Sequence, residues 1–270
     1  MCIKTQFQDR LLKPQDGLEL QLSCNNTKTD LEYFLTEDVQ VVHAPLNKNE
    51  DYSMGYNLHP EFSVDFPNTW NIHDYYLNII DSIAKHRQRS SLYVIHVSQS
   101  YETLRLNGLL FEVIHYIRSR ALEHRNIIFC IENAVLEVTD PNTNQLIVSD
   151  ISLENVGTCF DICHAQIVIH KDPPEFKSLT DFFRVNMFSC KLIHLNQAKE
   201  SILGFGMGSG HGAPFIRNNA NDVKCLQEIL DLYNLYGYNC PMTIEVFEPD
   251  YNDASNCIAT YDLLQSLLNR

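Results

Sequence analysis

The chain has 270 residues, of which 44% are hydrophobic, and a formal net charge of −14. This length suits one α/β barrel or two small domains, and no apolar run approaches the ~20 residues that a membrane-spanning helix needs. The acidic balance opposes general affinity for nucleic acid, which depends on a cationic surface, although a bound metal cluster would add positive charge locally.

Eight apolar, β-branched runs along the chain predict strands. They are near-continuous rather than alternating, as is typical of strands buried on both faces of a parallel sheet. In chain order the runs cover 2–7, 18–24, 39–45, 91–99, 126–133, 155–165, 191–197 and 242–248.

Helical patterns lie between several of these runs, with apolar residues three and four positions apart. They cover 71–88, 107–124, 221–237 and 255–270. Asn68 or Thr69 is placed to cap the first of them, and Gly237 to end the third. We expect loops at 141–145 and 170–176.

The alternation of strands and helices predicts a single-domain (β/α)8 barrel over residues 1–270. About ten residues separate the first strand from the second. This spacing is short for a crossover helix, so we expect the first β/α unit to be truncated.

The N-terminal residues contain no apolar core of a signal peptide, and the nine cysteines form no C-x-x-C pair. Scattered thiols are typical of a reducing compartment and of small buried core residues. We therefore expect a soluble cytoplasmic protein with free thiols, four of which lie in or beside apolar runs: Cys24, Cys130, Cys159 and Cys190.

Polar side chains fall at or near the ends of six successive predicted strands. They are His43, His96, Glu132, Asp161, His164, His194 and Glu245. In a barrel the C-terminal ends of the strands surround one opening, so these side chains should converge. Imidazole and carboxylate are the ligands that Zn²⁺ and Mn²⁺ take in proteins, and we therefore expect a metal site there.

A lone histidine is more often a core or rim residue than a ligand. We give that interpretation to the histidines away from strand ends. His73, His86, His115 and His124 fall on predicted helices, and His59 and His170 fall in loops.

The stretches "VVHAP", "VIHVSQS", "CIEN", "VGTCFDICHA", "IHLNQAK" and "TIEVFE" occur in an order that resembles the endonuclease IV and xylose-isomerase-like barrels. The resemblance runs from about residue 39 to 248, and "HAP" and "HLNxAK" are most similar to endonuclease IV, which cuts DNA at abasic sites with three zinc ions. The D-x-x-H element, Asp161 to His164, is shared by both branches of the superfamily.

The resemblance implies a role for each of these positions. His43 and His96 would hold a first metal, and Glu132 would bridge it to a second, held also by Asp161, His194 and Glu245. His164 would belong to a third metal, with His211 as a further candidate ligand. The resemblance also places Asn133, Asn196 and Lys199 at polar positions that lie either behind the metal ligands or on the phosphate side of the site, and they are candidates for binding the substrate. Phosphodiester hydrolysis would proceed through a hydroxide held between two metals.

Two positions depart from the endonuclease IV pattern. His211 follows Ser209 at the place where the family has a D-x-H pair, so "GSGHG" matches either that pair incompletely or the Gly-rich segment after it. Leu46 stands where the family has an aromatic residue that wedges into DNA. The five glycines from 204 to 212 predict a pliable loop over the barrel mouth, suited to gripping phosphate or to closing as a lid.

Three functions remain open from the sequence. The main reading is a hydrolase resembling endonuclease IV, with two or three Zn²⁺ ions and phosphodiester substrates, among them abasic DNA. The alternative is a sugar isomerase or epimerase with one Mn²⁺ or Mg²⁺, in which Glu132 and Glu245 move a proton at carbon and His164 contacts the sugar. A barrel that has lost catalysis and only binds ligands is the third, disfavoured by the complete ligand set. The sequence leaves the substrate, the metal and the oligomeric state open.

Overall fold

The fold is taken from a computed structural model, which describes residues 2–6, 17–22, 26–35, 39–45, 62–133, 142–170, 177–186, 188–202, 204–205, 210–237, 239–248 and 254–268. In this part of the chain, parallel strands close into a barrel in which each strand pairs with the next and β8 pairs with β1. The strands are β1 (Cys2–Gln6), β2 (Leu18–Gln21), β3 (Val39–His43), β4 (Ser91–His96), β5 (Ile127–Glu132), β6 (Val156–Asp161), β7 (Cys190–Leu195) and β8 (Met242–Ile244). The predicted (β/α)8 architecture is confirmed.

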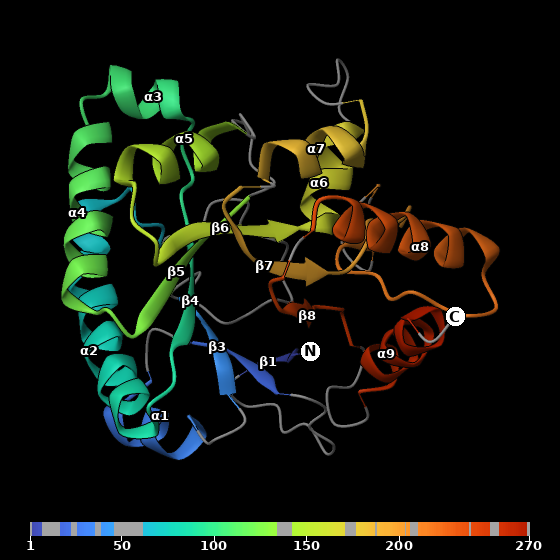
Figure 1. The fold of residues 1–270 in the computed structure, drawn as a ribbon, viewed down its shortest axis with the longest axis horizontal. Helices are drawn as coiled ribbons and strands as arrows, with labels where there is room; N and C mark the ends of the chain where they lie inside the picture. Colours follow the sequence, from blue (N-terminus) through green and yellow to red (C-terminus); the bar gives the residue numbers. More distant parts are fainter. Residues whose placement is uncertain are drawn as a thin grey trace.

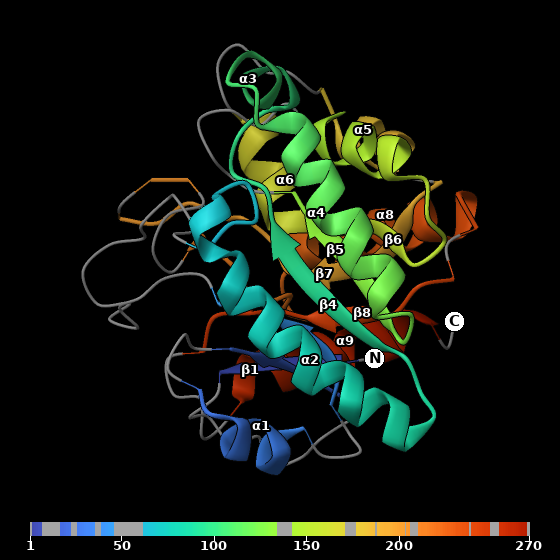
Figure 2. The same cartoon turned by 90° about the vertical axis from the view of Figure 1, so that its left-hand side faces the viewer.

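Helices surround the sheet (Figure 1). They are α1 (Lys28–Phe34), α2 (Trp70–Arg87) after the 3-10 turn η2 (Pro67–Thr69), α3 (Tyr101–Leu106), α4 (Leu110–Glu123), α5 (Asn142–Ile151), α6 (Ile162–Ile169), α7 (Leu179–Asn186), α8 (Ala220–Leu235) and α9 (Ser255–Leu268). Figure 2 shows α2 and α4 lying side by side against β4 and β5, which they contact. None of the described helices combines the length and apolar character needed to cross a membrane.

The sixth predicted strand is shorter than its apolar pattern indicates. It ends at Asp161, and the residues after it form α6 instead of continuing the strand to residue 165. The cause is local, because the Asp161 carboxylate accepts the backbone N–H of His164 at 2.7 Å and so caps the helix. His164 therefore lies in the first turn of α6 rather than at a strand end.

Two helix boundaries differ from the prediction. The segment expected to be a loop at 141–145 begins α5 at Asn142, whose buried apolar side chains follow only after its polar first turn. The helix expected over 107–124 starts at Leu110, because Gly108 turns the backbone to a φ of +73° between α3 and α4.

Helix ends were predicted with mixed success. Thr69 precedes α2 but makes no capping hydrogen bond to it; its hydroxyl instead donates to the carbonyls of Ser63 and Phe66. Gly237 has a φ of +63° just after α8, as expected of a helix stop.

Residues 7–16, where the first β/α unit is expected to be truncated, lie outside the described residues, as do 171–176.

The apolar core of the described residues has four parts, one of which is a small cluster of Cys163, Ile167 and Ala198. Two large clusters fill the space between the sheet and the helices, one for the first half of the chain and one for the second. A smaller cluster of Val41, Val94, Cys130, Cys159 and Leu192 comes from five successive strands and fills the barrel lumen. On each of these five strands a polar residue follows two positions later, so a polar ring lies directly above this apolar layer.

The described cysteines are free thiols, as expected. Cys190 and Cys240 place their sulfur atoms 3.8 Å apart without forming a disulfide. Cys24 lies outside the described residues.

Candidate metal centre at the mouth of the barrel

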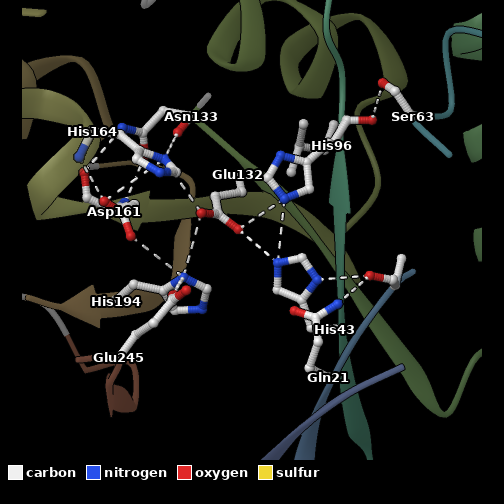
Figure 3. A network of polar contacts seen from close by, with 12 residues as sticks. Gln21, His43, Ser63, His96, Glu132, Asn133, Asp161, His164, His194 and Glu245 are labelled. Atoms are coloured by element: carbon white, nitrogen blue, oxygen red, sulfur yellow. Dashed lines mark hydrogen bonds and ion pairs between the residues drawn. The ribbon is translucent and has the colours of Figure 1, made fainter. Parts of the chain in front are cut away.

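Strand register brings the predicted ligands to one end of the barrel. His96 pairs with Glu132 across β4 and β5, and Asp161 pairs with His194 across β6 and β7. Glu245 directly follows β8. Figure 3 shows these side chains pointing toward one another above the strands, with Glu132 between the two histidine groups. The convergence predicted from the sequence is therefore present in the fold.

The first group consists of His43, His96 and one oxygen of Glu132. Nε2 of His43 lies 3.0 Å from Glu132 Oε2 and 3.2 Å from Nε2 of His96, and the remaining edge is 3.3 Å. Tetrahedral zinc ligands at their usual bond lengths lie about 3.3 Å apart. The three atoms thus have the spacing of one face of such a site.

The tautomer of His43 supports a cation in this group. Nδ1 of His43 lies 2.8 Å from the Ala44 carbonyl oxygen, which only accepts, so in the neutral ring Nδ1 carries the proton. Gln21 donates to the same carbonyl at 2.8 Å. The Nε2 lone pair of His43 then faces the Glu132 carboxylate, an arrangement that is repulsive unless a proton or a metal ion lies between them.

The second group uses the other oxygen of Glu132. Nδ1 of His194 lies 2.6 Å from Glu245 Oε2, 3.5 Å from Glu132 Oε1 and 3.7 Å from Asp161 Oδ2. This nitrogen is buried, yet its contacts lack hydrogen-bond geometry. The four ligand atoms of this group lie within 4.8 Å of one another, a spacing that fits a divalent cation.

Electrostatics in the second group also favour a cation. Burial, then the charges of Glu245 and Glu132, raises the pKa of Asp161 to about 7. Burial alone would lower the pKa of His194, but the acidic groups around it raise that pKa well above its usual value. For Glu132, the charges of His96 and His194 overcome burial and hold its pKa well below the usual value. A divalent ion would neutralise this concentration of buried carboxylates.

Cys159 lies beneath the second group and is close enough to Glu132 and His194 to offer a third ligand. Burial raises the pKa of its thiol well above the usual value. Since the thiolate is the form that binds metal, oxygen and nitrogen ligands fit better.

His164 and His211 form a pair of histidines beside the first and second groups. Their Nε2 atoms lie 3.0 Å apart, and Nδ1 of His164 lies 2.6 Å from the Asn133 carbonyl oxygen. Burial lowers the pKa of His164, which favours the neutral ring with its Nε2 lone pair toward His211. The two rings could supply two ligands of a further metal site, but neither belongs to a ligand group found among the described residues. Ser209, where the resemblance requires an acid, and Leu46 lie outside the described residues.

Glycines explain how His211 reaches this position. Lys199 N–H donates to the Gly210 carbonyl, and a Cβ at residue 210 would lie 2.2 Å from the Lys199 carbonyl oxygen. On the other side, Phe247 N–H donates to the carbonyl of Gly212, which has a φ of +63°. The described part of the glycine-rich loop is therefore fastened between the segments that follow β7 and β8.

Two of the polar residues named by the resemblance contact Asp161, which matches the alternative that places them behind the metal ligands. Asn133 accepts the Asp161 N–H at 2.7 Å and donates to the Asp161 carbonyl at 3.0 Å. Asn196 donates to Asp161 Oδ2 at 2.7 Å and accepts the Cys163 N–H at 2.8 Å. Both side-chain amides thus hold Asp161, a candidate metal ligand, in place.

Lys199, the third of these residues, pairs with a buried carboxylate on α8. Its Nζ lies 2.8 Å from Asp222 Oδ2 and 3.3 Å from the Pro214 carbonyl oxygen. This ion pair ties the segment after β7 to α8.

Sequence reasoning missed Glu19 on β2. Its carboxylate is fully buried, and Oε2 lies 3.2 Å from Nε2 of His194. The available signal was a carboxylate between two leucines in a predicted strand.

The remaining described histidines lie apart from the polar ring. His73 and His86 lie on α2 and His115 on α4, as predicted. His124 follows the end of α4, where it pairs with buried Asp81 at 3.3 Å. His170 follows α6, and His59 lies outside the described residues.

Neither a protein-family model nor a curated protein sequence matches the chain. Solved structures do match. A xylose isomerase domain protein from Planctomyces limnophilus aligns at a TM-score of 0.65 and 10% identity, over 100% of this chain and 98% of that one. D-psicose 3-epimerase from Clostridium cellulolyticum H10, solved with D-tagatose, aligns at 0.53 and 14% identity, over 93% and 86%. A xylose isomerase-like TIM barrel protein from Mycobacterium smegmatis in complex with magnesium aligns at 0.56 and 11% identity, over 92% and 84%. At these identities the likeness establishes the fold alone, a (β/α)8 barrel.

Proposed function

We propose that this chain is a divalent-metal-dependent isomerase or epimerase that acts on a small sugar or sugar phosphate. The observation that carries the proposal is the group of Glu132, Asp161, His194 and Glu245 at the barrel mouth. Three carboxylates and one imidazole suit Mn²⁺ or Mg²⁺, with substrate oxygens completing the coordination shell. The likeness to an epimerase and to a magnesium-bound barrel supports the same assignment.

The exposure of the site residues suggests their roles. Glu245 is the most open ligand of the group, with 21% of its side chain exposed, whereas Glu132 has 2%. A bound cation would polarise a substrate oxygen and so acidify the neighbouring C–H bond. Glu245 is then placed to take or return the proton at that carbon, with Glu132 as its deeper partner.

His164 is the second group that a substrate meets, with 11% of its side chain exposed. It donates from Nδ1 to the Asn133 carbonyl, so Nε2 carries a lone pair. A hydroxyl group of the substrate would donate to this lone pair in place of the His211 ring, whose Nε2 lies 3.0 Å away. The net charge of −14 is compatible with a small substrate and gives no general attraction to DNA.

Exchange of a substrate proton with solvent tests this proposal. We expect the Mn²⁺-loaded protein to incorporate deuterium from D₂O into one carbon of a ketose or aldose in a panel of sugars and sugar phosphates, detected by mass spectrometry and NMR. Glu245→Gln should abolish the exchange. Glu248→Gln is the matched control, because Glu248 is a nearby buried carboxylate that accepts the N–H groups of Asn256 and Cys257 at the start of α9. Absence of exchange across the panel would contradict the proposal.

A second candidate, phosphodiester hydrolysis, is favoured by one specific observation. The first group of ligands, His43, His96 and Glu132 Oε2, is one that a single-metal isomerase does not require. Two cations bridged by Glu132 would stabilise the charge that develops on a phosphoryl group, and the His164–His211 pair lies alongside.

Metal stoichiometry and activity separate the two candidates. A hydrolase should bind two or three Zn²⁺ ions per chain, lose one in His43→Ala, and incise a duplex that contains an abasic site. An isomerase should bind one ion, keep it in His43→Ala, and leave the duplex intact.

A further inference from the structure

Glu19 is a buried carboxylate that neither the predicted ligand set nor the proposed mechanism uses. Both Glu19 and His194 have no exposed side-chain surface, and Glu19 Oε2 lies 3.2 Å from Nε2 of His194. Burying a carboxylate has a large desolvation cost, so its position across the lumen from β7 needs a reason.

The two nitrogens of His194 face different surroundings. Nδ1 faces the carboxylates of the second metal group, the nearest being Glu245 at 2.6 Å. Nε2 faces Glu19 instead. A neutral imidazole carries one proton, so whichever nitrogen holds it cannot bind a metal.

We propose that Glu19 is a positioning residue that keeps the His194 proton on Nε2 and thereby presents the Nδ1 lone pair to the metal. The inference rests on the proposed metal-dependent function. Nε2 of His194 and the Glu19 carboxylate make an ion-pair contact at 3.2 Å, without hydrogen-bond geometry, and this contact is attractive only when the proton lies on Nε2. The negative charge of Glu19 would then make the ring a stronger ligand.

Glu19 acts through His194 rather than on the cation. None of the ligand groups found among the described residues includes it. The lumen layer formed by Val41, Val94, Cys130, Cys159 and Leu192 contributes only aliphatic groups and thiols. The Glu19 carboxylate is a strong acceptor beside Nε2 of His194 and can hold the ring in one orientation.

Cobalt binding tests the proposal without any assay of activity. Metal-free wild type, Glu19→Gln and Glu248→Gln would be titrated with Co²⁺, recording the affinity and the visible d–d spectrum. We expect Glu19→Gln to weaken Co²⁺ binding about 10- to 100-fold and to change the spectrum, the effect typical of removing an outer-shell partner. Glu248→Gln, which removes another buried carboxylate, should leave both unchanged.

The outcomes separate this inference from the proposed function. Failure of the wild type to bind Co²⁺ would overturn the metal-dependent function and, with it, the role of Glu19. Binding by the wild type with the same affinity and spectrum in Glu19→Gln would overturn the role of Glu19 alone.

A measurement on the wild type covers the case in which Glu19→Gln does not fold. In the Zn²⁺-loaded protein, the ¹⁵N signals of His194, assigned through bonds from the backbone of β7, should show the proton on Nε2. A proton on Nδ1 would overturn the proposal.

Discussion

Lowering the pH should destabilise the fold through His73, a buried imidazole on α2. Its Nε2 lies 2.7 Å from the Phe62 carbonyl oxygen, and its Nδ1 lies 3.0 Å from the Tyr93 hydroxyl. Because a carbonyl only accepts, Nε2 carries the proton and Nδ1 accepts from Tyr93. A second proton would bury a charge and remove the acceptor of the phenol. Burial lowers the pKa of His73 from 6.5 to about 4.

The magnitude follows from the difference in pKa between the folded and unfolded chains. Between pH 6.5 and about pH 4, the unfolded chain binds a proton at this site that the folded chain does not. The free energy of unfolding therefore falls by about 1.4 kcal/mol for each unit of pH, or about 3 kcal/mol over the whole window. Above pH 6.5 the contribution of His73 is fully present and constant.

Urea unfolding of wild type and His73→Gln over this pH range measures the effect. The glutamine amide can donate to the Phe62 carbonyl but does not titrate. Carboxylates that titrate in the same range are common to both proteins and cancel in the comparison. The stability advantage of wild type over His73→Gln should shrink by about 3 kcal/mol from neutral pH to about pH 4. Parallel stability curves for the two proteins would refute the reasoning.

Glu132→Gln should lower the metal content and abolish any activity, because Glu132 contributes to both ligand groups; unchanged metal content by elemental analysis would contradict this. Chelation should lower the melting temperature and added Zn²⁺ or Mn²⁺ should restore it, since a ligand at 100 times its dissociation constant stabilises the folded state by about 2.7 kcal/mol; equal midpoints by calorimetry would argue against a bound metal. Gly210→Ala should destabilise more than Gly108→Ala in urea unfolding. A Cβ at 210 would lie 2.2 Å from a backbone carbonyl oxygen, whereas at 108 nothing lies within 4 Å and the cost is that of the φ of +73°, about 1–2 kcal/mol. Phe183→Ala should lower the free energy of unfolding by about 3–5 kcal/mol, because the fully buried ring packs against Phe160 at 4.7 Å between centroids; a loss below 1 kcal/mol in urea unfolding would show that the site collapses around the smaller side chain.

The barrel and its polar ring could be predicted because both depend on periodic, local signals. Apolar strands mark the sheet, and parallel register then places the last residue of each strand at one end. His96 and Glu132 are the clearest case, since they pair directly across β4 and β5. Neither residue alone indicated a site, but their positions in successive strands did.

Element boundaries near the site could not be predicted from apolar pattern alone. Apart from Asp161 and His164, the stretch from 157 to 165 has the composition of one buried strand, and only the hydrogen bond from His164 N–H to the Asp161 side chain shows where the strand ends and the helix begins. The start of α5 at Asn142 was hidden in the same way, by a polar first turn.

The role of Glu19 depends on contacts across the lumen, which sequence spacing does not encode. Glu19 and His194 are far apart in the chain and lie on strands that do not pair with each other. The same applies to the orientation of His194, because which nitrogen faces the ligands follows only from the folded geometry.

The apolar layer beneath the polar ring limits how small molecules can enter and leave the site. Val41, Val94 and Leu192 close the lumen below the site. A molecule that reaches Glu245 from solvent therefore has to leave through the opening by which it entered. Product and substrate would then pass through the same opening, and a product that dissociates slowly would act as a competitive inhibitor of its own formation.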